Sequence, residues 1–256
     1  MLRVGVFGAG GRMGATVCEA LAADPDLELV AAVDPHRVGV AAGGAVVAAH
    51  RQAVADAGAE VVVDFTIADA ARDNLVWLAE QRIHAVVGTT GLTGEDLERL
   101  DFAFTSADRA CVVVPNFAIG AVLMMRFAEL AAPYFDTAEV IELHHNAKID
   151  APSGTARLTV ERMAAASSTW APDPTEHEML TGVRGAEGPA GIRVHSVRMG
   201  GMVAHHEVIL GTEGQTLTIR HDSTDRASFM PGVLAAVKAV PGHSGLIVGL
   251  DTLLAI

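Results

Sequence analysis

Five short, almost wholly apolar segments, separated mostly by helical stretches, dominate the first half of this chain. These expected strands are Arg3–Phe7, Leu27–Val33, Glu60–Phe65, Ala85–Val87 and Cys111–Val114. Strands that are apolar on both faces and alternate with helices form parallel sheets with helices on both sides. The pattern therefore predicts an α/β domain with a doubly wound parallel sheet, whose ligand site lies beyond the carboxyl ends of the strands.

After Phe117 the sequence no longer shows short apolar strands that alternate with helices. A helix is expected over 120–132, and a polar segment rich in Pro, Gly, Glu and Thr over 168–191 predicts a long surface loop. Further strands predict an open antiparallel or mixed sheet whose later connections are hairpins; they are Ala138–His144, Gly191–Arg198, Ala204–Gly211 and Gln215–Arg220. A last helix over 226–240 and the apolar stretch 245–254 return to the first domain. We therefore expect two domains: 1–117 with 226–256, and an α+β domain over 118–225.

The composition limits the kinds of molecule that this protein can bind. The 256 residues carry a formal net charge of −13 without a basic cluster, so the surface repels nucleic acids and anionic membranes. A small anionic substrate would then need positive charge inside its own pocket. The chain shows no run of about 18 apolar residues and no secretory signal, and we expect a cytoplasmic protein. Cys18 and Cys111 are expected to be reduced core residues, and no Cys and His spacing indicates a metal site.

A glycine-rich turn joins the first strand to the first helix, and it reads Gly8-Ala9-Gly10-Gly11-Arg12-Met13-Gly14. The glycines allow a tight turn and let backbone N–H groups approach a pyrophosphate, although Met13 breaks the more familiar G-x-G-x-x-G spacing. Asp34 ends the second strand, about twenty residues further on, where a carboxylate can bind the diol of an adenosine ribose. That position favours NADH, whereas Arg37 can reach a 2′-phosphate, so both NADH and NADPH remain open. The plainer alternative makes Asp34 a turn residue before Pro35.

The ends of the later strands carry further polar or flexible residues. Taken singly, Gly88-Thr89-Thr90-Gly91 is also consistent with a hydroxyl-rich turn and Pro115-Asn116-Phe117 with a domain hinge. Their shared place beyond strand ends favours contact with a nicotinamide or a substrate. The predicted cofactor-binding residues are Gly8, Ala9, Gly10, Gly11, Arg12, Met13, Asp34, Phe65, Gly88, Thr89, Thr90, Val114, Pro115, Asn116 and Phe117, and Thr90 is also a predicted substrate contact.

A twelve-residue run combines imidazoles, an amine and an anion-binding turn, and it reads His144-His145-Asn146-Ala147-Lys148-Ile149-Asp150-Ala151-Pro152-Ser153-Gly154-Thr155. Two imidazoles and a nearby lysine can present protons and positive charge. The Pro-Ser-Gly-Thr end precedes an expected helix over 156–166, whose first N–H groups are free to bind an oxyanion. The run predicts a pocket for an acidic substrate. An isolated histidine pair and lysine at a strand end would instead be ordinary solvated residues.

These motifs together closely resemble the dihydrodipicolinate reductase family over the whole chain. The resemblance rests on Val6–Gly14, Val63–Thr66, Val87–Gly91, Pro115–Phe117 and, most specifically, Glu142–Ala156. It implies NADH- or NADPH-dependent reduction of 4-hydroxy-tetrahydrodipicolinate to tetrahydrodipicolinate with loss of water, in lysine and diaminopimelate biosynthesis. It also implies a Rossmann-like nucleotide domain and a homotetramer formed through the sheet of the second domain, where Val194, Val208 and Leu210 offer apolar positions.

The resemblance also assigns roles within the twelve-residue run. It makes His144 and Lys148 the candidate proton donors, without deciding which of them delivers the proton. It implies that His145 and Lys148 bind one substrate carboxylate and that Gly154 and Thr155 hold the other. Asp150 is expected to orient the loop.

Two alternatives remain beside this interpretation. One is a different reductase or dehydrogenase of the same architecture, such as an aspartate dehydrogenase-like enzyme, and the His-His-x-x-Lys spacing argues against it. The other is a non-catalytic sensor that binds NAD, which would have no need of Lys148 beside a proton donor. His205-His206 lies within an expected strand, where alternation sends one imidazole to each face. We expect a structural role for the pair, with a ring that faces the pocket as the alternative.

Overall fold

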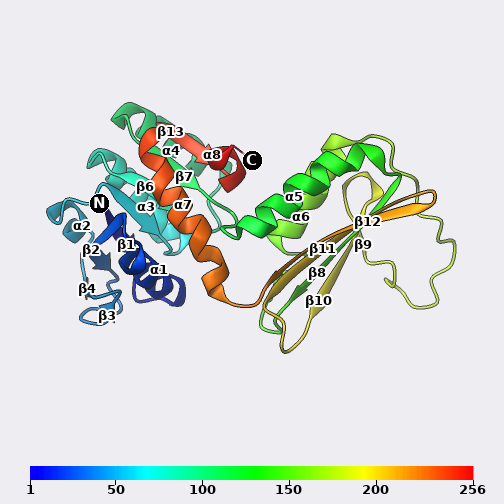
Figure 1. Cartoon of the computed structure of the whole chain (residues 1–256), viewed down its shortest axis with the longest axis horizontal. Helices are drawn as coiled ribbons and strands as arrows, with labels where there is room; N and C mark the ends of the chain where they lie inside the picture. The colour runs from blue at the N-terminus through cyan, green and yellow to red at the C-terminus, as the bar shows by residue number, and fades with distance from the viewer. Residues whose placement is uncertain (256) are drawn as a thin grey trace. The chain divides into compact units, whose positions relative to one another are not determined.

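The computed structural model describes residues 1–255 and divides into two compact units. The first unit contains Met1–Ile119 and the chain from Phe229 onward, and the second contains Gly120–Ser228 (Figure 1). The chain thus passes between the units at 119/120 and 228/229, close to the expected domain boundaries at 117/118 and 225/226.

The first unit is built on an eight-stranded sheet with the order β13-β7-β6-β5-β1-β2-β4-β3. Neighbouring strands are parallel except in the β3–β4 hairpin. The strands are β1 (Leu2–Phe7), β2 (Leu27–Val33), β3 (Ala41–Ala42), β4 (Ala45–Ala48), β5 (Val61–Asp64), β6 (His84–Val87), β7 (Ala110–Val113) and β13 (Gly245–Val248). The chain leaves the central β1 first toward β2 and later toward β5, which is the doubly wound arrangement. The predicted fold class is confirmed for this unit, whereas the small β3–β4 hairpin was not predicted.

Helices cover this sheet on both faces because right-handed crossovers in opposite directions place them on opposite sides. The helices are α1 (Arg12–Ala23), α2 (Gln52–Asp56), α3 (Ala68–Glu80), α4 (Gly94–Ala107), α7 (Met230–Ala239) and α8 (Leu250–Leu254). Contacts join α3 to α4 and α1 to α7. Where one long helix was expected over 226–240, a 3-10 turn at Arg226–Phe229 precedes α7.

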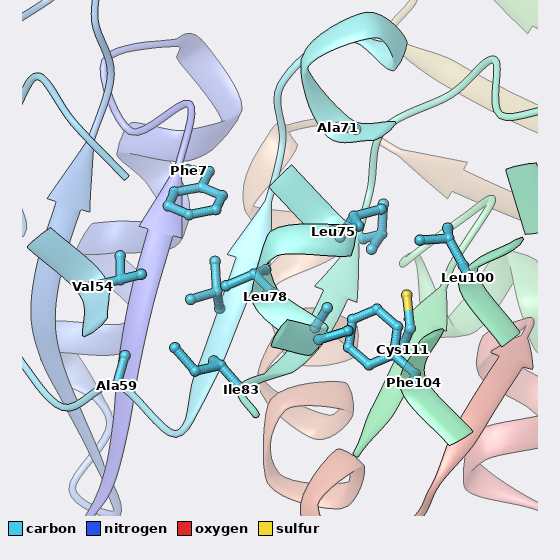
Figure 2. Close-up of a cluster of buried hydrophobic side chains, with 14 of the residues drawn as sticks. Phe7, Val54, Ala59, Ala71, Leu75, Leu78, Ile83, Leu100, Phe104 and Cys111 are labelled. Atoms are coloured by element: carbon cyan, nitrogen blue, oxygen red, sulfur yellow. The ribbon is translucent and has the colours of Figure 1, made fainter. Parts of the chain in front are cut away.

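A cluster of buried side chains lies between the sheet and the helices α2, α3 and α4 (Figure 2). Leu75 and Leu78 stand one turn apart on α3, and Phe104 comes from α4; each is fully buried. The strands beneath them are valine-rich and buried along their whole length, as β5, β6 and β7 illustrate. β-Branched residues suit strands that are covered on both faces, so this region of the fold follows directly from the sequence.

The second unit holds a five-stranded sheet with the order β12-β11-β8-β10-β9. Its elements are α5 (Ile119–Ala131), β8 (Thr137–His144), α6 (Gly154–Ala166), β9 (Ala186–Glu187), β10 (Arg193–Arg198), β11 (Ala204–Thr212) and β12 (Gln215–Ser223), with 3-10 turns at Ala132–Tyr134 and Pro189–Gly191. The β11–β12 hairpin was predicted correctly. The sheet is mixed, which is one of the two expected forms: β10 runs parallel to β8, and a parallel pair needs a crossover, which α6 and the long loop provide.

Side chains alternate strictly along β8, and the buried set is Ala138, Val140, Glu142 and His144. Val194, Val208 and Leu210 are also buried within the described chain, so these three side chains serve the core of their own unit. Their expected availability for contact between subunits is therefore wrong. The intervening side chains, such as Ile141, point to the opposite face and stay half-exposed.

Cys18 and Cys111 are buried free thiols, as predicted, and burial raises the pKa of the Cys18 thiol to about 12.

Within residues 1–255, none of the helices is both long enough and apolar enough to cross a lipid bilayer.

We expect Phe104→Ala to lower the free energy of unfolding of the first unit by about 3–5 kcal/mol, because the change empties space in a packed core. The matched control is Phe102→Ala on the same helix, whose side chain is 77% exposed and whose removal should change stability by about 0.5 kcal/mol or less. The free energy of unfolding of both variants is measured by urea titration, with tryptophan fluorescence as the signal. Trp77 lies 6.5 Å from Phe7 between ring centroids and reports this unit when Trp170 is replaced by Phe in every variant. Equal stability of the two variants would contradict the assignment of this core.

Candidate active site

The glycine-rich turn between β1 and α1 is held by close backbone approaches. Gly8 has a φ of +73°, and a side chain at Gly14 would place its Cβ 2.1 Å from the Gly8 carbonyl oxygen. Only glycine fits at these two positions without displacing the strand or the helix. Gly11 precedes α1 and provides no side-chain cap, so the positive end of the helix faces outward for an anion.

Asp34 lies at the carboxyl end of β2 beside this turn, and its side chain is buried. Its Oδ2 accepts a hydrogen bond from the Gly10 N–H at 3.1 Å, and its Oδ1 accepts one from the His36 N–H at 2.9 Å. A Cβ at Gly10 would lie 2.2 Å from the Arg37 Cβ, so the Arg37 stem also packs on the turn. Asp34 thus has the turn role that the sequence offered as the plainer alternative, and its carboxylate also lies against the glycine turn, while ribose binding stays a prediction.

A cavity of about 440 Å³ opens at the carboxyl ends of β1, β2, β4 and β5. Gly8, Gly11, Asp34 and Phe65 line it together with basic side chains such as Arg51. Its volume lies within the usual range for a small-molecule site, and its place agrees with the general rule for doubly wound sheets. The cavity and the uncapped start of α1 fit the adenosine and pyrophosphate groups of a dinucleotide.

Asp64 at the end of β5 organises the neighbouring loops, although the sequence did not single it out as a site residue. Its fully buried carboxylate accepts hydrogen bonds from the Thr66 N–H at 2.8 Å, the Thr66 hydroxyl at 2.6 Å, the Thr89 hydroxyl at 3.1 Å and the Asn74 amide at 3.3 Å. One signal was present in the sequence, since a carboxylate closes an otherwise apolar strand. The network fixes Thr89, whereas Thr90 beside it is exposed.

The remaining predicted cofactor residues also gather in the first unit. The Phe65 ring covers Gly88 so closely that a Cβ there would lie 2.1 Å from it, and the Phe65 and Phe117 ring centroids are 5.6 Å apart. Asn116 Oδ1 accepts a hydrogen bond from the Ala118 N–H at 2.8 Å. Ala9 and Val114 are buried, Met13 is half-buried, and Arg12 and Pro115 are exposed.

In the second unit, His144 ends β8 with a side chain that is almost fully buried. Its Nδ1 contacts Oε2 of Glu142, which stands two residues earlier and so on the same face of the strand. The Arg198 guanidinium donates two hydrogen bonds to the Glu142 carboxylate, at 2.8 and 2.7 Å. Burial lowers the pKa of His144, and the Glu142 carboxylate opposes that shift. For Glu142, burial raises the pKa, but hydrogen bonds from Arg198 and other donors outweigh it and lower the pKa to about 2.

The loop after β8 presents the predicted lysine. The Lys148 Nζ lies 2.8 Å from both carboxylate oxygens of Asp150, which agrees with the expected orienting role of that aspartate. The Lys148 N–H donates to the His145 carbonyl at 3.1 Å and closes a turn, and the His145 side chain is exposed. This arrangement holds one amine and one imidazole at the surface of the loop beyond His144.

The loop ends at α6, whose first turn is anchored from two sides. The Ser153 hydroxyl caps the helix by accepting a hydrogen bond from the Ala156 N–H at 3.2 Å. The Ser153 N–H itself donates to Glu142 Oε1 at 3.2 Å. Gly154 and Thr155 are the first two residues of α6, so their N–H groups stand at its positive end.

His205 and His206 were expected to have a structural role, with a ring that faces the pocket as the alternative. His206 Nε2 lies 2.8 Å from the Ser153 Oγ, and its ring meets the His144 ring edge-on with centroids 5.4 Å apart. His205 Nδ1 contacts Asp222 at 2.6 Å. Both imidazoles are buried, and His206 is the one that contacts the site, whereas the partner of His205 is Asp222 on β12.

Three supporting residues were not predicted as members of the site: Glu142, Arg198 and His206. The sequence offered a signal for Glu142, because it stands two residues before His144 and residues two apart on a strand share a face. Arg198 had none, because its place beside His144 follows from the parallel register of β10 with β8. Over residues 1–255, no three His, Cys, Asp or Glu side chains form a group suited to a metal ion.

Comparison with known proteins agrees with this geometry. The family models for the N-terminus and C-terminus of dihydrodipicolinate reductase match residues 2–117 and 120–254. The 4-hydroxy-tetrahydrodipicolinate reductase of Cutibacterium acnes is 50% identical, with 99% of each chain covered, and that of Nocardia farcinica is 51% identical, with 99% of this chain and 98% of the relative covered. The solved dipicolinate-bound dihydrodipicolinate reductase from Paenisporosarcina sp. TG-14 has a TM-score of 0.88 and 37% identity, with 98% of each chain covered. The chain therefore belongs to the dihydrodipicolinate reductase family, pyridine-nucleotide-dependent oxidoreductases of lysine and diaminopimelate biosynthesis.

Proposed function

We propose that the protein reduces 4-hydroxy-tetrahydrodipicolinate to tetrahydrodipicolinate, with loss of water, at the expense of NADH or NADPH. One observation carries the proposal. A carboxylate-bound imidazole at the end of β8, a lysine and the start of α6 are joined by the single loop that follows β8. Such a loop offers proton donors and an oxyanion site together, which the reduction of an unsaturated dicarboxylate requires.

The substrate carboxylates would bind at two points of this loop. One meets the Lys148 amine and the exposed imidazole of His145, and the other accepts hydrogen bonds from the Gly154 and Thr155 N–H groups at the start of α6. Local positive charge is needed because the whole chain carries a net charge of −13. The dipicolinate-bound relative supports a dicarboxylate ligand for this arrangement.

The proton would come from His144 or Lys148. Contact with Glu142 engages Nδ1 of His144 and leaves Nε2 as the nitrogen that can face a substrate. Lys148 is bound to Asp150, and a substrate carboxylate would compete for the same amine. When bound, the nicotinamide supplies the hydride, and these side chains supply the proton that completes the reduction.

Both nucleotides are proposed cofactors. Asp34 lies where a carboxylate can accept hydrogen bonds from a ribose diol, which favours NADH. Arg37 packs beside Asp34 on the glycine turn, and Arg51 lines the same cavity; both can offer positive charge to a 2′-phosphate. We further propose a cytoplasmic homotetramer, with the half-exposed face of the β8–β12 sheet as the contact between subunits.

His144→Ala and Lys148→Ala should each lower kcat by about 100-fold or more, because each change removes a candidate proton donor. NADH binding should stay unchanged, because the proposed nucleotide contacts lie in the other unit. The assay follows NADH absorbance, with substrate made in place from pyruvate and aspartate semialdehyde by the preceding synthase. The controls are His177→Ala, in an exposed loop, and Lys238→Ala, which loses two surface ion pairs. Full turnover in both His144 and Lys148 variants would refute the assignment, and a wild-type protein that binds NADH without oxidising it would favour a sensor.

Asp34→Asn should raise the ratio of kcat/KM with NADPH to kcat/KM with NADH by about tenfold. The change weakens charge-assisted hydrogen bonds to the ribose diol and relieves repulsion of a 2′-phosphate, and tenfold corresponds to about 1.4 kcal/mol. The control variant is Asp26→Asn, because Asp26 is an exposed aspartate just before β2. An equal loss with both nucleotides would mean that Asp34 serves only the turn.

A further inference from the structure

The Glu142 carboxylate joins three segments of the second unit. Its Oε1 accepts from the Ser153 N–H at 3.2 Å and from Arg198 Nη2 at 2.7 Å. Its Oε2 accepts from Arg198 Nη1 at 2.8 Å and contacts His144 Nδ1. The Glu142 side chain is 0% exposed, so its two carboxylate oxygens are shielded from water.

We propose that Glu142 is a positioning residue that fixes the proton donor His144 and the carboxylate-binding start of α6 in one geometry. The inference rests on the proposed reductase function and deepens it. Glu142 itself would touch neither substrate nor cofactor. One oxygen orients the imidazole, and the other holds the backbone of Ser153 directly before the N–H groups of α6.

Charge explains why a carboxylate suits this position. A buried anion is costly unless a cation and hydrogen bonds compensate it, and the two-point contact from Arg198 provides that compensation. An anionic Glu142 accepts from every donor around it, whereas a glutamine would turn its amide toward at least one N–H group. A carboxylate partner also fixes which imidazole nitrogen carries hydrogen, as in other histidine sites.

The charged and titratable groups that face His144 come from four segments. They are Glu142 on its own strand, Arg198 on β10, His206 on β11 and Lys148 in the loop. Burial lowers the pKa of His144, Lys148 and Arg198 lower it further, and Glu142 is the group that raises it. Loss of the Glu142 charge therefore moves the pKa of His144 downward, so its protonated form disappears at a lower pH.

The test compares Glu142→Gln with Glu139→Gln. Glu139 is a matched control because it also pairs with an arginine and a histidine, Arg184 and His195, from the opposite face of β8. We expect Glu142→Gln to lower kcat by about tenfold to 100-fold, as small displacements of a reacting group do. The alkaline limb of the pH profile should move to lower pH by about one unit. The dissociation constant for dipicolinate, measured by calorimetry with NADH bound, should rise about tenfold.

Three outcomes would overturn the inference, and a fourth would overturn the proposed function. Wild-type turnover, pH limb and dipicolinate affinity in Glu142→Gln would overturn it, and so would equal losses in a Glu139→Gln variant that keeps the oligomeric state of the wild type. A wild-type protein without substrate-dependent NADH oxidation would overturn the proposed function instead, which keeps the two failures distinct. Where the glutamine variant fails to fold, Glu142→Asp keeps the buried charge beside Arg198 but shortens the side chain by one methylene. Wild-type kcat and dipicolinate binding in that variant would also overturn the inference.

Discussion

The alternation of side chains along β8 places Glu142 and His144 on one buried face, and the organisation of the second unit depends on that pair. Arg198 compensates the carboxylate, and the backbone of Ser153 closes the loop onto it. Because one buried anion binds both the strand end and the helix start, the intervening loop is held at its two ends. Lys148 lies within this loop, so an exchange of its partner Asp150 for a substrate carboxylate would leave the Glu142 contacts at the two ends of the loop in place.

The first unit depends on a different constraint, the close approach of backbone to backbone. Gly8 and Gly14 leave no room for side chains, and this brings the start of α1 against the end of β1. The same contact aligns the positive end of the helix with the cavity beside Asp34. Asp64 has a comparable role at the end of the adjacent strand β5, where it ties Thr66 and Thr89 together. Neutral donors surround that carboxylate, whereas an arginine compensates Glu142.

The sequence predicted the first unit well because its information is local. Apolar strands, helical spacing and glycine turns each specify their own element, and the crossover rule then orders the sheet. The second unit was predicted less completely, because parallel pairing of β10 with β8 depends on contacts between segments far apart in the chain. Arg198 and His206 were missed for the same reason. Their neighbours in sequence carry no sign of the partners that they contact, which are Glu142 for Arg198 and His144 for His206.

The most direct measurement is a crystal structure with NADH and dipicolinate bound. We expect one carboxylate of dipicolinate on the Gly154 and Thr155 N–H groups and the other on Lys148, with that amine released from Asp150. His144 should keep its contact with Glu142 while its Nε2 faces the ligand. A dicarboxylate bound elsewhere, with the start of α6 free and Lys148 still paired with Asp150, would contradict the proposed arrangement.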